Sequence, residues 1–246
     1  MERLKSLSLA SCNIEGDKHI KTIREFLQQY SPDVVCFQEA IEDNMEDLAR
    51  MFDYSLFFKG CTILSKNLFG NLSSEKILGL AVLSHHPIND SGSYTYAGNP
   101  YSIPIYQRGK PNSSRRELVY ASMADEYTFA TTHFTWTPEG KVNEEQLQDI
   151  KVLIEKAKLI GDCVLTGDFN APRPNAIYQQ LTADYKDEVP DQYTSSLDPN
   201  LHRLGRTKEL LVDYIFSTSK YRVTDVRLID GVSDHKALIA QVAVNK

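Results

Sequence analysis

The sequence predicts an α/β fold that forms a single domain over residues 1–246. Apolar runs of strand length alternate with segments whose apolar residues recur at three- and four-residue steps, the spacing of an amphipathic helix. With 246 residues, 41% of them hydrophobic, the chain can bury a sizeable core. Many apolar runs end in polar side chains, and ligands of α/β sheets bind outside the carboxyl ends of strands. The pattern therefore predicts a site built from strand ends.

The first forty residues predict a strand, a helix and a second strand. Leu4 to Ala10 alternates apolar and polar residues, Lys18 to Tyr30 has helical periodicity, and Val34 to Phe37 is a continuous apolar run. Strands joined in this way are usually parallel, so their carboxyl ends meet at one edge of the sheet. We expect the polar residues that follow the two strands to lie together there, namely Asn13, Glu15 and Glu39.

The middle of the chain predicts a helix at Glu42 to Phe52 and strands at Ile77 to Leu83, Glu117 to Met123 and Tyr127 to Thr132, the last two joined by a hairpin at 124–126. Ser91 to Ser114 is rich in Gly, Pro, Ser, Tyr and Asn, which predicts a long surface loop that faces substrate. Positive charge gathers there on Arg108, Lys110, Arg115 and Arg116. An arginine of this group either reaches a phosphate oxygen or is simply hydrated.

The last part of the chain predicts helices at Glu144 to Lys158 and Ala176 to Leu181, and strands at Val164 to Thr166, Leu210 to Phe216, Tyr221 to Leu228 and Leu238 to Val244. Trp136, the only tryptophan, precedes the first of these helices and either packs against it or stacks on a substrate. A second basic cluster, His202 to Lys208, lies in an irregular stretch and is consistent with a hydrated loop.

Two carboxylates of this part stand out. Asp168 and Asn170 follow a glycine at the end of an apolar strand, and in an extended chain they would face the same way. Asp213 lies inside an apolar strand, where an ionised group normally needs a partner or a function. Taken one at a time, such residues are more often turn or strand caps than catalytic groups.

Composition narrows the class of protein. A formal net charge of -6 does not favour a protein that coats nucleic acid, although a bound divalent cation would supply positive charge locally. The four cysteines have no CxxC pairing, so we expect small buried thiols. Neither a signal peptide nor a membrane-spanning segment is recognisable, so we expect a cytoplasmic protein, monomeric and without stable membrane association.

Together these motifs resemble the endonuclease/exonuclease/phosphatase superfamily of metal-dependent phosphoesterases, whose fold is like that of pancreatic deoxyribonuclease. The motifs occur in the family's order: Asn13 and Glu15, Gln38-Glu39, Arg116-x-Leu118, Thr132-His133, Gly167-Asp168-Phe169-Asn170, Asp213-Tyr214-Ile215-Phe216 and Ser233-Asp234-His235. Each motif alone is weak, but several in order are hard to reach by chance. The resemblance implies a four-layer αββα sandwich of two mixed β-sheets flanked by helices.

The resemblance also implies roles for these residues. Glu39 would hold Mg²⁺, with Mn²⁺ as a substitute, together with Asn13, with Glu15 through water, and with Asp234. Asp168 would deprotonate the attacking water, and Asn170 would hold it in place. His235, made cationic by Asp213, would bind phosphate oxygens from one side, and His133 and Arg116 from the other.

Within the family, the motif pattern is nearest to members like tyrosyl-DNA phosphodiesterase. Leu-Val-Asp-Tyr at 211–214 disfavours the inositol polyphosphate 5-phosphatases, which have a segment like Trp-Cys-Asp-Arg, and His133 stands where abasic-site endonucleases have tyrosine. Ser11-Cys12-Asn13 departs from the Thr-Trp-Asn usual in the tyrosyl-DNA branch. We therefore expect hydrolysis of a phosphodiester in nucleic acid or a nucleic-acid adduct. The alternatives are a lipid, inositol or other small phosphorylated substrate, or an inactive binding protein on the same fold.

Overall fold

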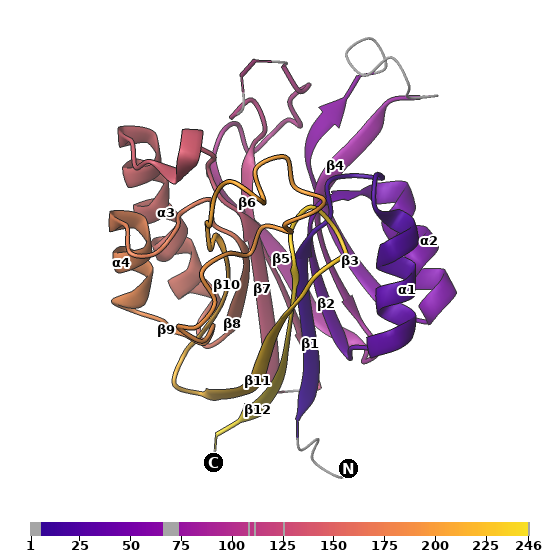
Figure 1. Ribbon diagram of the computed structural model, residues 1–246. Coiled ribbons are helices and arrows are strands. Elements are labelled where there is room, and N and C mark those ends of the chain that lie inside the picture. Colours follow the sequence, from indigo (N-terminus) through magenta and orange to yellow (C-terminus); the bar gives the residue numbers. More distant parts are fainter. Residues whose placement is uncertain (1–5, 66–73, 108, 111, 125, 246) are drawn as a thin grey trace.

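The protein has four layers, two β-sheets between two pairs of helices (Figure 1). The computed structural model describes residues 6–65, 74–107, 109–110, 112–124 and 126–245. Helices α1 (Ile20–Tyr30) and α2 (Glu42–Phe52) cover the outer face of one sheet, and α3 (Glu144–Ile160) and α4 (Ala176–Thr182) cover that of the other. The αββα sandwich implied by the sequence motifs is confirmed.

Each sheet has six strands and mixes parallel and antiparallel pairs. The first has the order β11 (Tyr221–Ile229), β12 (Ala237–Val244), β1 (Leu7–Asn13), β2 (Val34–Ile41), β4 (Lys76–Ser84), β3 (Ser55–Leu64). The second has the order β5 (Ile88–Ala97), β6 (Arg116–Met123), β7 (Tyr127–His133), β8 (Val164–Asp168), β10 (Asp213–Ser217), β9 (Lys186–Asp187). The C-terminal hairpin thus returns to complete the first sheet.

One parallel pair in each sheet positions the site. In the first sheet β1 runs parallel to β2, with Asn13 opposite Gln38, and in the second β7 runs parallel to β8, with His133 opposite Asp168. Both pairs are joined by a connection that contains a helix, which is why their carboxyl ends coincide. The four strands therefore deliver polar residues to one rim of the sandwich.

The two sheets pack through apolar side chains and a few buried polar contacts. Leu9 and Val34 of the first sheet join the same apolar cluster as Leu118 and Phe129 of the second. Beside the rim, Gln38 donates from Nε2 to Thr131 Oγ1 at 2.8 Å, and this hydrogen bond joins β2 to β7. This hydrogen bond fixes how the two sheets meet next to the strand ends.

The structure corrects one expected loop. Part of the stretch Ser91–Ser114 is the edge strand β5, which pairs with β6, and the irregular segment starts only at Gly98. The strand was missed because its side chains are mostly half-exposed and small or polar, so no apolar alternation marks it. Arg108 of the basic group and Asp125 of the expected hairpin lie outside the described residues.

Other boundaries shift by a few residues. The first strand starts at Leu7 and runs through Asn13, residues 1–5 being outside the described part, and the strand expected at Leu210 starts at Asp213. Three of the four cysteines are buried, and all four are free thiols, as expected. Among the described residues, no helix is both long and apolar enough to cross a bilayer.

Candidate active site

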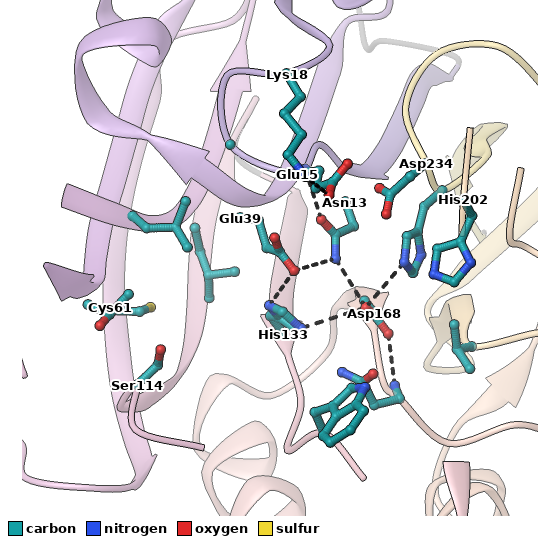
Figure 2. A pocket seen from close by; sticks show the side chains of 18 of the residues that line it. Asn13, Glu15, Lys18, Glu39, Cys61, Ser114, His133, Asp168, His202 and Asp234 are labelled. Atoms are coloured by element: carbon teal, nitrogen blue, oxygen red, sulfur yellow. Dashed lines mark hydrogen bonds and ion pairs between the residues drawn. The ribbon is translucent and has the colours of Figure 1, made fainter. Parts of the chain in front are cut away.

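Strand ends from both sheets converge on the carboxylate of Asp168 (Figure 2). Asn13 donates from Nδ2 to Asp168 Oδ2 and to Glu39 Oε1, both at 3.1 Å. His133 lies beside the same groups, with Nε2 at 3.6 Å from Asp168 Oδ2 and Nδ1 at 3.8 Å from Glu39 Oε1. The carboxamide of Asn13 therefore ties the two sheets together at the point where their polar residues meet.

Asp168 is almost fully buried, and its pKa is displaced accordingly. Burial, and after it the Asp213 carboxylate, raise the pKa to about 7 against the opposing effect of His235. Oδ1 accepts the backbone N–H of Asn170 at 2.9 Å, so one oxygen is held by the turn after the strand. An aspartate with a pKa near neutrality is suited to exchange a proton with water.

The chain is not extended at Asn170, so the alternation expected of an extended chain does not set the direction of its side chain. The chain leaves the strand after Asp168, and Asn170 has a left-handed backbone with φ +50°. Its side-chain Nδ2 donates to the carbonyl of Phe134 at 3.0 Å. Asn170 consequently links the loop after β8 to the loop after β7, while it still lines the cleft.

Behind Asp168, His235 forms a buried pair with Asp213. Nδ1 of His235 lies 2.7 Å from Asp213 Oδ2, and Nε2 lies 3.9 Å from Asp168 Oδ2. Burial alone would lower the pKa of His235, but the two carboxylates outweigh it and hold this pKa well above its ordinary value. A second hydrogen bond, from Ser196 Oγ at 2.6 Å, orients Asp213. The imidazole is therefore a cation fixed beside the Asp168 carboxylate.

His133 differs from His235 in charge. Burial lowers the pKa of His133 well below its ordinary value, and the nearby cations Arg116 and His235 lower it further. Arg116 donates from Nη1 to the His133 carbonyl at 3.2 Å and from Nη2 to Asn112 Oδ1 at 2.8 Å. Its Nε is buried and has no partner among the described residues. The site thus pairs a neutral histidine with a cationic one.

Three carboxylates lie beside this core, on Glu39, Glu15 and Asp234 (Figure 2). Burial raises the pKa of Glu39, and the charges of Asp234 and Glu15 raise it further. Burial would also raise the pKa of Glu15, but hydrogen bonds from Lys18 and His19 lower it overall. Ligand atoms of Glu15, His19 and Asp234 lie within 4.8 Å of one another. Clustered hard oxygen donors that disfavour each other's charge fit a divalent cation.

The backbone explains why these carboxylates face the cleft. Glu39 has φ +51° and lies where the register of β2 against β4 shifts, so a bulge turns its side chain out of the normal alternation. Glu15, with φ +49°, is also not extended, although it lines the same cleft as Asn13. Its N–H donates to Asn13 Oδ1 at 3.2 Å. Asn13 therefore uses both ends of its amide within the protein.

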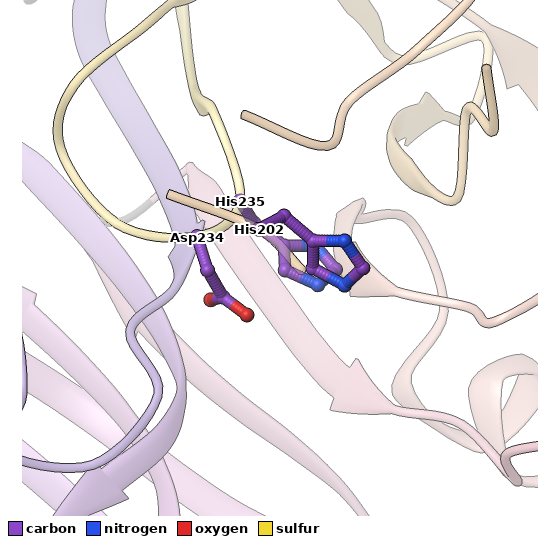
Figure 3. Close-up of side chains that lie close together, drawn as sticks. All are labelled: His202, Asp234 and His235. Carbon is purple, nitrogen blue, oxygen red and sulfur yellow. The ribbon is translucent and has the colours of Figure 1, made fainter. Parts of the chain in front are cut away.

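The sequence motifs did not indicate three further residues of this site, Lys18, His19 and His202. Lys18 pairs with Glu15, and burial, which lowers its pKa, is outweighed by that hydrogen bond. His202 lies against His235, with ring centroids 5.8 Å apart, and both are close to Asp234 (Figure 3). Because Nδ1 of His202 accepts the N–H of Leu204 at 3.0 Å, the neutral ring carries its proton on Nε2. The only signal for His202 was the basic cluster, expected to be hydrated.

All predicted site residues except Asp213 line one cleft of about 1230 Å³. The cleft extends from Cys61 and Ser114 on one side of Asp168 to His202 on the other (Figure 2). Asp213 does not line the cleft but contacts His235, which does. The structure therefore brings together the residues that the motifs singled out, Asn13, Glu15, Glu39, Arg116, His133, Asp168, Asn170, Asp234 and His235.

Solved structures with this fold cover nearly the whole chain. An endonuclease/exonuclease/phosphatase from Bacteroides vulgatus is 20% identical, with a TM-score of 0.71 over 98% of this chain and 100% of that one. A mannosyl-6-phosphatase from Bacteroides thetaiotaomicron is 16% identical, with a TM-score of 0.68 over 97% and 100%. Humanized D. rerio TDP2 carrying 14 mutations is 16% identical, with a TM-score of 0.63 over 97% and 99%.

Identities this low establish a shared fold and no shared substrate. No curated protein matches the chain. The sequence profile of the Endonuclease/Exonuclease/phosphatase family, however, matches residues 10–235, a span that contains every residue of the site described above. The chain therefore belongs to the Endonuclease/Exonuclease/phosphatase family.

Proposed function

We propose that this protein is a divalent-metal-dependent phosphodiesterase that cleaves an ester in nucleic acid or a nucleic-acid adduct by in-line attack of water. The observation that carries the proposal is the arrangement around Asp168, a buried carboxylate of raised pKa with a cationic His235 on one side and a neutral His133 on the other. Phosphoester hydrolysis needs a base for water and fixed positive charge for phosphate oxygens, and this arrangement supplies both.

Each residue has a role set by its contacts. Asp168 accepts the proton of the attacking water, while Asn13 and the N–H of Asn170 keep its two oxygens in place. His235, kept cationic by Asp213, binds the non-bridging phosphate oxygens as negative charge builds on them. His133 offers a neutral hydrogen-bond donor from the opposite side.

Arg116 supports the phosphate site from behind His133. Its guanidinium holds the carbonyl of His133, and the buried Nε–H is the group left for an anion. Glu39, Asp234 and Glu15 would hold the cation, Glu15 through water; ligand atoms of Glu15 and Asp234 lie within 4.8 Å of each other. Mg²⁺ fits these oxygen ligands best, and Mn²⁺ can substitute. When bound, the cation supplies Lewis-acid stabilisation of the phosphoryl group.

The size of the cleft supports a substrate longer than one phosphate group. Its volume of about 1230 Å³ exceeds that of most small-molecule sites, and its lining includes the cationic side chains Lys18 and Arg203 and the aromatic ring of Trp136. Carboxylates outnumber the cationic side chains in this lining, so a bound divalent cation would have to supply part of the positive charge that a nucleic-acid strand needs. The aromatic ring is the feature that suits a single strand, because an unpaired base can stack on it. A short strand or a strand end fits this groove better than a long duplex, because the formal net charge is -6.

A small phosphorylated compound is the second candidate. It is favoured by the same net charge and by the likeness in fold to the mannosyl-6-phosphatase. A panel of substrates separates the two: single-stranded, abasic and 5′-tyrosyl oligonucleotides, a phosphoinositide, choline phosphate and mannose 6-phosphate, each with Mg²⁺ and with chelator. Chelator-sensitive cleavage of the oligonucleotides is expected, with Asp168→Asn as the inactive control. Turnover of the small compounds alone would overturn the proposal.

A further inference from the structure

The backbone of Trp136, in the loop after β7, is held by hydrogen bonds on both of its polar groups. The N–H of Trp136 donates to Asn112 Oδ1, and Nδ2 of the same amide donates to the Trp136 carbonyl, both at 3.1 Å. Asn112 is itself fixed by Arg116 Nη2 at 2.8 Å and by Glu145 Oε2 at 2.9 Å. The side chain of Asn112 thus binds both backbone polar groups of Trp136. Arg116, which donates to Asn112, also donates to the carbonyl of His133.

A second set of contacts fixes Trp136 relative to the reacting carboxylate. Gln146, fully buried on α3, donates from Nε2 to the carbonyl of Thr135 at 2.8 Å and to that of Asn170 at 3.3 Å. Further along the loop, a Cβ on Gly140 would lie 2.4 Å from Pro172, so the backbone there approaches the loop after β8 closely. The position of Trp136 is therefore tied to the turn that carries Asp168 and Asn170.

The indole itself is not used to hold the fold. Its neighbours Thr135 and Thr137 are buried, whereas Trp136 is half-exposed and lines the cleft. It belongs to neither apolar cluster, and among the described residues no ring contact or hydrogen bond involves its side chain. A large aromatic face held in place and open to a cleft is prepared to stack on a planar ring.

We propose that Trp136 is a specificity-determining residue, a platform on which an aromatic ring of the substrate stacks while the adjoining phosphate lies at Asp168. The chemical class is a phosphoester that carries a nucleobase, or the phenol ring of a tyrosyl adduct, next to the scissile bond. This inference rests on the proposed function and narrows it, because a sugar or inositol phosphate has no ring to stack.

The single tryptophan makes the contact directly measurable. In the Asp168→Asn variant, which binds without turnover, titration with oligothymidylate in the presence of Mg²⁺ should quench the indole fluorescence. An abasic oligomer of equal length carries the same charge without nucleobase rings and should leave the fluorescence nearly unchanged. A 5′-tyrosyl abasic oligomer tests whether the stacking ring is the phenol of a tyrosyl adduct. Equal quenching by the abasic oligomer, or none by any ring-bearing ligand, would overturn the proposal.

Kinetics of substituted enzymes provide the second test. Trp136→Leu should raise KM for the thymidine oligomer about tenfold more than for the abasic oligomer, as loss of one base stack does. Trp136→Phe should recover most of that difference. Tyr101→Leu is the matched control, since Tyr101 is 95% exposed and does not line the cleft. An equal rise for both oligomers would mean that Trp136 only maintains the loop.

The two proposals fail in different ways. If the wild-type enzyme cleaves none of the oligonucleotides, the 5′-tyrosyl one included, the proposed function is wrong. If it cleaves both and Trp136→Leu does not discriminate between them, only the stacking role is wrong.

Discussion

Nδ1 of His235 lies 2.7 Å from Oδ2 of Asp213, in the buried floor of the cleft. The other oxygen of Asp213, Oδ1, has no hydrogen-bond partner among the described residues, so the contacts of Oδ2 with His235 and Ser196 are the ones that orient the carboxylate. This contact opposes the effect of burial and holds the pKa of His235 above its ordinary value. The charge of His235 therefore depends on a residue that lies behind it.

Asp213→Asn should lower kcat by about 10²-fold, because His235 loses the charge that stabilises the phosphate oxygens. His235 is cationic below its pKa, and this substitution lowers that pKa. The alkaline limb of the pH–rate profile should consequently move to lower pH. NMR titration of the His235 ring checks the cause, and an unmoved alkaline limb would contradict it.

Asp168→Asn should remove activity and also stabilise the protein at neutral pH. The pKa of Asp168 is raised to about 7 by burial, so the unfolded chain releases this proton at lower pH than the folded one. The group therefore favours folding below its ordinary pKa, near 4, and that contribution is lost as pH rises through about 7.

The stabilisation by Asp168→Asn should accordingly grow between pH 4 and pH 8, at most by about 1.4 kcal/mol for each unit of pKa shift removed. Denaturant titrations at several pH values measure it. The exposed Asp162→Asn is the control and should show no such trend. A gain that does not change with pH would show that Asp168 ionises normally in the folded state.

Glu39→Gln should abolish stabilisation by metal. A ligand that binds only the folded state raises Tm with its concentration, and removing a charged oxygen ligand removes that rise. Thermal unfolding with Mg²⁺ or Mn²⁺ against chelator gives the comparison, and Glu46→Gln on the exposed side of α2 is the control. A full metal-dependent rise in the Glu39→Gln variant would exclude Glu39 as a ligand.

Gly167→Ala should destabilise the fold by at least about 3 kcal/mol, since backbone must move to admit the side chain. At φ +140°, an added Cβ would lie 2.0 Å from the carbonyl oxygen of Thr132, next to His133. Gly161→Ala is the matched control, because its φ is also positive, +82°, but nothing lies within 4 Å of the added Cβ, so only backbone strain of about 1–3 kcal/mol is expected. Equal losses in the two variants would contradict the steric explanation.

Local sequence patterns were sufficient to find the residues at strand ends. Asp168 follows an apolar run, and parallel pairing of β1 with β2 follows from the helix between them, so the convergence of Asn13 with Glu39 was predictable. Helix α2 has the bounds that its periodicity indicated. These features depend on neighbours close in sequence, which a single sequence displays.

His202 could not be found in this way, because a distant contact sets its position. Its loop is held by Asp198, whose side chain accepts the N–H groups of Asn200, Leu201 and Gly231, the last at 2.7 Å. Gly231 belongs to the connection that carries His235, so the loop is placed by the chain's own tertiary fold. No pattern within residues 198–208 encodes that contact.

The extended backbone assumed at Glu15 and Asn170 was wrong for a different reason. Alternation in an extended chain assigns each residue to a face, but both residues have positive φ and lie in turns. The spacing of two residues, between Asn13 and Glu15 and between Asp168 and Asn170, identified residues that line the cleft. It did not predict the directions of their side chains.

The C-terminal hairpin has a consequence for how the protein becomes active during synthesis. Strand β12 supplies the neighbour of β1, and the connection between β11 and β12 carries Asp234 and His235. Residues 221–244 are synthesised after all the other elements described, so a chain that stops short of them lacks one neighbour of β1 and also His235 beside Asp168. We therefore expect that the proposed hydrolysis needs this segment, and that it begins only after β12 has paired with β1.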